Sequence, residues 1–224
     1  MSIFTKAIPG TKNTVIYTDS SGKYFRYSGG TRAWRNHNPG NIRPGPISRK
    51  HHQIGVVFNF AIFPDYTTGH EALLDLIRTV YYGKSIDQTV EKFAPSSENN
   101  TTNYKKFLHN QTGVMDDRKI KDFTPEEFEK LWKGIEKIEG SKEGNVVEVY
   151  RITKVHQNKK GSICSYYLNS DEWVSKKECI DLAKQGKVEL EVCRSRLGDS
   201  YLRAIPDNLF QISLKKLVVK ILEG

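Results

Sequence analysis

A polar loop between Arg35 and Arg43 has the side chains needed to bind a polar ligand. It reads Arg-Asn-His-Asn-Pro-Gly-Asn-Ile-Arg, and this density of asparagine, proline and glycine favours a turn over a core strand or helix. Its side chains offer amide and guanidinium donors together with carbonyl acceptors. We therefore expect Asn38, Asn41 and Arg43 to contact a ligand rich in hydroxyl and acyl oxygens. The alternative is a structural turn whose asparagines satisfy their own backbone.

Basic residues gather around this loop. The net charge is +9, and residues 1–64 hold nine Lys or Arg against a single acid, Asp19, whereas the remainder is nearly balanced at 26 against 25. Such an excess points to an anionic partner: nucleic acid, anionic lipid or the bacterial cell wall. Its position beside the loop favours a charged surface around a site, so we predict no nucleic-acid partner. A solvated basic face is the alternative.

Histidines near the loop do not have the spacing of a metal site. His51 and His52 are adjacent, so their side chains diverge on any regular element, and no cysteine or carboxylate is spaced to join them or His37. We expect a solvated loop here, with no metal and no cofactor.

The composition is that of an ordinary folded protein, with 37% hydrophobic and 27% charged residues. No run approaches the roughly 18 apolar residues of a membrane span, and the first residues lack the apolar core of a secretory signal. We expect synthesis in the cytoplasm without membrane insertion. The three cysteines are odd in number and lack metal-ligand spacing, which predicts buried free thiols. They are Cys164, Cys179 and Cys193.

Short extended segments flank the loop on both sides. Residues 14–17 and 23–27 have strand-like composition around a turn at 19–22, which predicts a hairpin. After the loop, the apolar and β-branched run 54–63 predicts a strand or an extended buried segment.

Four helices are predicted after that run. Apolar residues recur at helical spacing from Thr68 to about Gly83, and two shorter helices follow over 86–94 and around 104–108. The fourth has the clearest signals: Thr124 as N-cap, Glu127 completing a capping box, and Gly140 as the stop.

Composition shifts near residue 144, where a polar linker leads into alternating strands with one helix at 175–185. We predict two domains, 1–143 and 144–224, the second a small α+β unit.

Three segments, in this order, carry a family resemblance: residues 35–43, residues 63–73 and residues 93–104. The second reads Phe-Pro-Asp-Tyr-Thr-Thr-Gly-His-Glu-Ala-Leu and the third Phe-Ala-Pro-Ser-Ser-Glu-Asn-Asn-Thr-Thr-Asn-Tyr. Together they resemble phage and bacterial cell-wall-degrading domains of the lysozyme-like superfamily, over residues 30–140. The resemblance implies an α+β fold, mainly helical with a small β region, that cuts the glycan of peptidoglycan as a muramidase, glucosaminidase or lytic transglycosylase. Residues 146–215 resemble a small bacterial domain of unknown function.

The acid that such chemistry requires is not in its usual place. Glycosidic cleavage needs a proton donor for the leaving oxygen, and in this superfamily a Glu at a helix end precedes the sugar-binding loop. Residues 1–70 contain no Glu. Either the domain is not an enzyme, or its order is permuted and the acid comes later in the chain.

Glu139 is the candidate for a late acid. The segment 133–140, which ends in Ile-Glu-Gly, resembles the close of the superfamily's catalytic helix, and Glu139 falls on the apolar stripe of its helix. A carboxyl beside apolar groups keeps its proton more readily, as a general acid must. The alternatives are a helix-end carboxylate without a role and, as a rival acid, Glu136.

Other acids fit structural roles at least as well. Glu71 would favour the dipole of a first helical turn, Asp65 would form a turn, and Glu98 lies among cap residues. With no second carboxylate singled out, we expect a single-acid mechanism in which substrate or water completes the reaction.

Aromatic residues extend the predicted site. Tyr66, with Trp34 as an alternative, is a candidate platform for sugar stacking. Tyr104 resembles the superfamily's aromatic residue near the cleft, although a plain core position fits its spacing too.

The function expected is peptidoglycan cleavage in phage lysis or wall penetration, or as an exported antibacterial effector. The protein would then act in the periplasm or cell wall after export, injection or lysis. The alternatives are a non-catalytic wall-binding or virion structural protein and, from charge alone, a nucleic-acid-binding protein. The tail would bind a delivery protein, an immunity protein or the wall itself.

Overall fold

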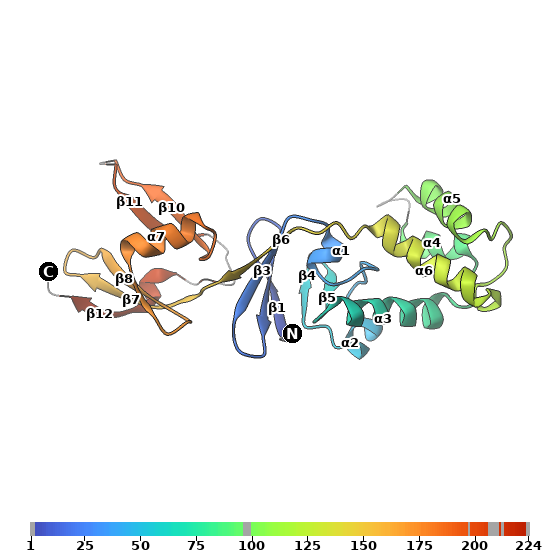
Figure 1. Cartoon of the computed structure of the whole chain (residues 1–224), viewed down its shortest axis with the longest axis horizontal. Helices are drawn as coiled ribbons and strands as arrows, with labels where there is room; N and C mark the ends of the chain where they lie inside the picture. The colour runs from blue at the N-terminus through green and yellow to red at the C-terminus, as the bar shows by residue number, and fades with distance from the viewer. Residues whose placement is uncertain (1–2, 96–99, 197, 206–210, 212, 223–224) are drawn as a thin grey trace. The chain divides into compact units, whose positions relative to one another are not determined.

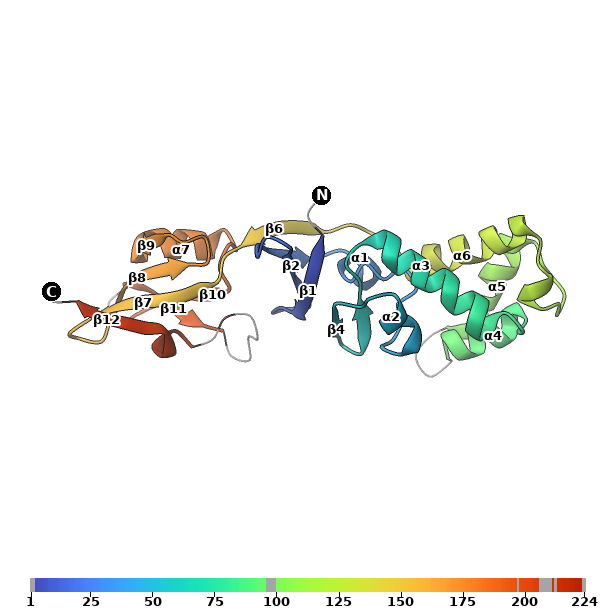
Figure 2. The same cartoon turned by 90° about the horizontal axis from the view of Figure 1, so that it is seen from below.

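The computed structural model describes residues 3–95, 100–196, 198–205, 211 and 213–222 as an α+β protein (Figures 1 and 2). Contacts divide the chain into two compact units. We call residues 30–144 the helical unit, and residues 1–29 with 145–224 the sheet unit. The predicted α+β class is confirmed. Within the described residues, no helix combines the length and apolarity needed to cross a bilayer.

The N-terminal region is a sheet, which corrects the prediction of a mainly helical domain from residue 1. Strands β1 (Phe4–Pro9), β2 (Val15–Asp19) and β3 (Tyr24–Ser28) pair antiparallel, and β3 pairs in turn with β6 (Asn145–Val149). The predicted hairpin is confirmed as β2 and β3, with the Asp19 side chain accepting hydrogen bonds from its turn. Because β3 takes its partner from beyond residue 144, the first 29 residues group with the C-terminal part of the chain.

The rest of the sheet unit has the predicted strands and helix, with additional edge strands. A sheet of order β12-β7-β8-β9 packs with α7 (Lys176–Lys184), and β10 pairs with β11. These strands are β7 (Ile152–Asn158), β8 (Ile163–Leu168), β9 (Trp173–Ser175), β10 (Leu190–Arg194), β11 (Ser200–Ala204) and β12 (Val218–Leu222). All three cysteines are free, but only Cys179 is buried, so the predicted burial is wrong for Cys164 and Cys193.

Among its described residues, the helical unit contains the four predicted helices, two short α-helices and a 3-10 helix (Ile120–Asp122). The start of α6 has a local cause: Thr124 caps the first turn and its backbone N–H donates to the Glu127 side chain, as the capping box predicted. Gly140 ends the helix with a positive φ of 77°. The helices are α1 (Arg32–Arg35), α2 (Pro46–Lys50), α3 (Tyr66–Leu76), which continues as a π-helical turn (Ile77–Tyr81), α4 (Ile86–Phe93), α5 (Thr101–Thr112) and α6 (Pro125–Glu139).

The run 54–63 is a hairpin where one strand or extended segment was expected. Strands β4 (Gly55–Val57) and β5 (Phe60–Ile62) are joined by Phe58 and Asn59, whose φ values are 45° and 63°. Two positive φ angles in a row make a tight hairpin turn. Asparagine suits this turn but phenylalanine does not, so the sequence carried little turn signal.

Candidate active site

The polar loop is folded by its own buried asparagine. The Asn38 side chain is fully buried; its Nδ2 donates to the carbonyls of Ile42 and Ala61, both at 2.9 Å, and its Oδ1 accepts from the Ile42 N–H at 2.8 Å. Both amide donors are therefore used inside the protein. The predicted ligand contact of Asn38 is wrong, and the structural-turn alternative describes this residue.

Helix α3 and strand β5 hold the loop in place. The Phe63 N–H donates to the Asn36 carbonyl at 3.0 Å, and the Ala61 N–H donates to the Ile42 carbonyl at 2.9 Å. Gly69 of α3 lies directly against the backbone of His37, where a side chain would not fit. The motif Thr-Thr-Gly-His thus places a glycine where α3 meets the loop.

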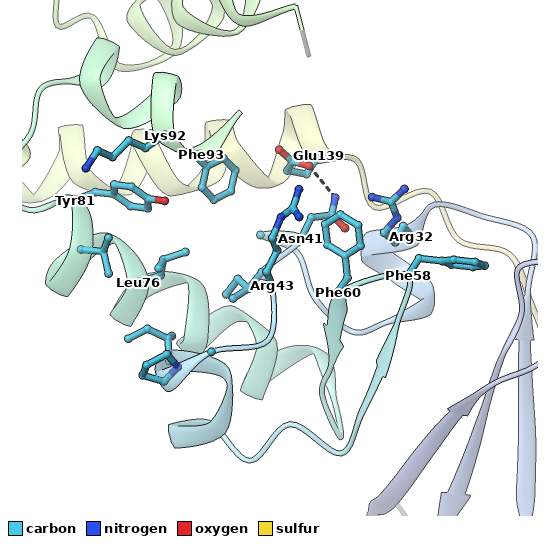
Figure 3. A pocket seen from close by; sticks show the side chains of 16 residues that line it. Arg32, Asn41, Arg43, Phe58, Phe60, Leu76, Tyr81, Lys92, Phe93 and Glu139 are labelled. Carbon is cyan, nitrogen blue, oxygen red and sulfur yellow. Dashed lines mark hydrogen bonds between the residues drawn. The ribbon is translucent and has the colours of Figure 1, made fainter. Parts of the chain in front are cut away.

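Glu139, at the end of α6, meets this loop through Asn41. The Asn41 Nδ2 donates to Glu139 Oε2 at 2.7 Å (Figure 3). The Tyr104 hydroxyl donates to Glu139 Oε1 at 3.0 Å. Three elements far apart in sequence therefore converge on one half-buried carboxyl group. The structure brings together three of the predicted site residues.

Asn41 is held in this position at an energetic cost. Its φ is 43°, in the left-handed region, and its Oδ1 is buried without a hydrogen-bond partner among the described residues. Asparagine tolerates this backbone conformation better than other residues with a Cβ. Strain and unsatisfied polar atoms concentrate at functional sites, so both features favour a role for Asn41 beyond folding.

Tyr104 remains a protonated donor beside the carboxylate. Burial, followed by the charge and hydrogen bond of Glu139, raises the pKa of Tyr104 far above its ordinary value. Only 5% of its surface is exposed, and its ring packs edge-on against Phe93. Tyr104 is thus a core residue, as one of the two alternatives held, and only its hydroxyl reaches Glu139; it is not among the residues that line the neighbouring cleft.

A cleft of about 840 Å³ opens in front of Glu139. One wall is apolar and comes from α3, its π-helical turn and α4; the other comes from the polar loop and the β4–β5 hairpin (Figure 3). Of the described residues that line it, Glu139 is the only acidic one. The predicted binding residue Arg43 lies on this lining, with its guanidinium 5.7 Å from the centre of the Phe60 ring.

Tyr66 and Glu136 form a separate cluster that does not line the cleft. His70 Nδ1 lies 2.7 Å from Glu136 Oε1, and the rings of Tyr66 and His70 are stacked. Burial, followed by a hydrogen bond to Glu136, raises the pKa of Tyr66. Tyr66, predicted as a platform for sugar stacking, and the rival acid Glu136 are therefore both outside the lining of the cleft.

The remaining candidates take structural positions or fall outside the structure. Asp65 caps α3 by accepting from the Thr68 N–H at 2.8 Å, as expected of a turn former. Glu71 is exposed on α3, beyond its first turn, and neither it nor Trp34 lines the cleft. Glu98 lies outside the described residues. No group of three or more potential ligands for a metal occurs among the residues with described positions.

Sequence reasoning missed the side chains that shape the walls. Their signals were present but ambiguous, because aromatic residues of a buried strand and of a cleft wall look alike in sequence. Only the hairpin turn shows that residues 58 and 60 reach the cleft. The missed residues include Arg32, Phe58, Phe60, Tyr81, Lys92 and Phe93.

If Glu139 is the predicted acid, removing the Tyr104 hydroxyl should slow its reaction without unfolding the protein. In Tyr104→Phe the ring still packs against Phe93, but Glu139 loses one of two donors, a charge-assisted bond worth roughly 1.5–3 kcal/mol. We expect a fall of about tenfold or more in the turnover of a glycan substrate, with a melting temperature within a few degrees of wild type. Initial rates and calorimetry on the two proteins check this. Equal rates would show that the bond has no part in turnover.

Comparisons with known proteins give two matches. Residues 137–217 match the family described as "Protein of unknown function (DUF3892)", a match that begins inside α6 and covers less than half of the chain. The chain is also a distant homologue of "Protein P5" of Pseudoalteromonas phage PM2, with 34% identity over 100 residues, 42% of this chain and 62% of that protein. The chain thus spans less than two thirds of the length of this relative.

Proposed function

We propose that the helical unit cleaves the glycan strand of peptidoglycan, with Glu139 as its single general acid. The observation that carries this proposal is that Asn41 and Tyr104 both donate to Glu139, and that Asn41 and Glu139 line one cleft. Glu139 alone among the described lining residues can donate a proton as a carboxylic acid. The resemblance of residues 30–140 to the lysozyme-like superfamily supplies the substrate class.

The two donors determine where the proton of neutral Glu139 sits. Asn41 Nδ2 can only donate, so Oε2 stays unprotonated, whereas the Tyr104 hydroxyl can turn from donor to acceptor. The proton therefore belongs on Oε1. It passes to the glycosidic oxygen as the bond from that oxygen to the anomeric carbon breaks, leaving an oxocarbenium-like sugar. Water, or a hydroxyl of the same sugar, then attacks that carbon, and the proton that it loses returns to the carboxylate of Glu139.

A permuted order of the same parts accounts for the missing early acid. The loop comes first and its acid follows 98 residues later, measured from Asn41 to Glu139. The resemblance places the acid helix before the loop. The loop and the end of α6 meet through the side chains of Asn41 and Glu139. This pairing is therefore compatible with either order of the loop and the helix along the chain.

Similarity to a phage protein supports a phage context, in lysis or wall penetration, over an exported effector. The second candidate, a non-catalytic wall-binding or virion structural protein, is equally compatible with a phage context. Binding of a delivery or immunity protein by the sheet unit stays a prediction.

Purified peptidoglycan incubated with the full chain tests the proposal. Release of soluble glycan fragments by the wild type, and not by Glu139→Gln, supports glycosidase activity. Mass spectrometry of the new ends separates the two second steps: reducing ends indicate hydrolysis and anhydro ends indicate transglycosylation. Intact peptidoglycan that nevertheless retains the protein in a pull-down would favour the non-catalytic candidate.

A further inference from the structure

The cleft carries more positive than negative charge. Of the described residues that line it, Arg32, Arg43 and Lys92 are cationic and only Glu139 is acidic. The hydrogen bonds to Glu139 come from neutral donors, Asn41 and Tyr104, so Glu139 forms no ion pair with Arg32 or Lys92. Neither Arg32 nor Lys92 makes an ion pair with any described residue.

The orientation of the Arg32 guanidinium is suited to binding a carboxylate. Its guanidinium lies over the ring of Phe60, 4.1 Å from the ring centre, and its side chain is otherwise exposed. Stacking fixes the plane of the guanidinium and leaves the N–H groups at its edge available for a paired hydrogen bond. Burial, followed by the nearby charge of Arg32, lowers the pKa of Arg35, as expected where positive charge is not compensated.

The cations flank the acid. In Figure 3, Lys92 lies beyond Phe93 on one side of Glu139, and Arg32 lies beside Phe60 on the other. A linear substrate whose scissile bond meets Glu139 would therefore pass a cation on each side. A neutral glycan would leave these charges without partners, whereas a strand with repeated acidic groups would pair with them.

We propose that the cleft selects an acidic glycan whose free carboxylates pair with Arg32 on one side of the scissile bond and with Lys92 on the other. This inference rests on the proposed function, since it places the scissile bond at Glu139. It adds the requirement that the carboxylates be ionised and unmodified. Peptidoglycan whose carboxyl groups have been converted to amides, or a neutral chitin oligosaccharide, is then a poor substrate.

The experiment pairs a change in the protein with a change in the substrate. Soluble peptidoglycan strands are used as isolated, or after their carboxylates are coupled to methylamine with a carbodiimide. Initial cleavage rates are measured for wild type, Arg32→Gln and Lys92→Gln. Lys106→Gln serves as the control, because Lys106 is exposed on α5 away from the cleft.

One charge-assisted pair is worth roughly tenfold or more, so we expect amidation, which removes both pairs, to lower the wild-type kcat/KM roughly a hundredfold or more. Arg32→Gln and Lys92→Gln, which each remove one pair, should each lose roughly tenfold on native strands and differ little from wild type on amidated ones, because the same interaction cannot be removed twice. Arg32→Lys should recover part of the loss, and Lys106→Gln should behave as wild type on both substrates.

Two outcomes overturn the inference while leaving the proposed function intact: equal wild-type rates on native and amidated strands, or an Arg32→Gln loss of the same size on both. Binding to the Glu139→Gln chain, measured by calorimetry, separates the remaining cases. Strands that bind in a carboxylate-dependent way but are never cleaved by wild type would remove the proposed function and keep the acidic-glycan site. Strands that neither bind nor react would remove both.

Discussion

Glu139→Gln should lower glycan cleavage by roughly a hundred- to ten-thousandfold, the range that general acid catalysis contributes. Glutamine has nearly the same size and keeps the end of α6, but it has no proton to give to the leaving oxygen. It also turns one acceptor oxygen into an amide donor; the Tyr104 hydroxyl can accept from this amide only by giving up its own donation, so charge-assisted bonds at this group become neutral ones. We therefore expect a small loss of stability, about 1 kcal/mol, together with the large loss of activity.

Glu136→Gln is the matched control. It changes the same residue type on the same helix one turn earlier, where the side chain contacts His70 and does not line the cleft. Its activity should stay near that of wild type. A variant series in which Glu136→Gln is inactive and Glu139→Gln is active would instead assign the acid to the rival residue. Rates on peptidoglycan, with thermal unfolding of each variant, distinguish these results.

Local signals in the sequence were enough to predict the four longer helices. The Thr124 cap, the Glu127 side chain and the Gly140 stop fix the ends of α6 within a few residues, because capping bonds form between near neighbours. The end of that helix in turn fixes Glu139. The pairing of Glu139 with the loop was predicted from the family resemblance, which implies an acid beside such a loop, and from the absence of Glu in residues 1–70.

Features set by distant parts of the chain were not predicted. No local pattern shows that β3 pairs with β6, because an exposed strand edge accepts any compatible partner. Asn38 and Asn41 illustrate the same limit inside one loop. Both are asparagines three residues apart, yet one is buried in the loop's own hydrogen bonds and the other reaches Glu139. The sequence shows that both residues are asparagines. Their different roles arise only from the packing of α6 and β5 against the loop.

Gly69→Ala should damage both the stability and the activity of the helical unit. A Cβ at residue 69 would lie 1.8 Å from the carbonyl oxygen of His37 and 2.9 Å from its carbonyl carbon. Both are backbone atoms, and the loop that contains them is tied to Ile42 and Ala61 by Asn38, so no side-chain rotation relieves the clash. Either α3 or the loop must move. Overpacking of this kind costs roughly 1–3 kcal/mol.

The same displacement should reach the carboxyl group of Glu139. The loop bearing His37 also carries Asn41, whose Nδ2 holds Glu139 at 2.7 Å. A shift of about 1 Å in a positioning group can lower a rate about a hundredfold. Gly69→Ala should therefore lower kcat/KM by a factor of that order even at temperatures where the protein remains folded. Urea unfolding and initial rates on one preparation measure the two effects separately.

Gly83→Ala provides the control for backbone freedom. No atom lies within 4 Å of a Cβ at residue 83, and its φ is not positive, so alanine should be tolerated and the reduced freedom of the unfolded chain can even raise stability slightly. If Gly69→Ala matched Gly83→Ala in both measurements, α3 would not pack directly on the loop, and the placement of Asn41 would need another cause. If only stability fell, the loop would hold Glu139 independently of α3.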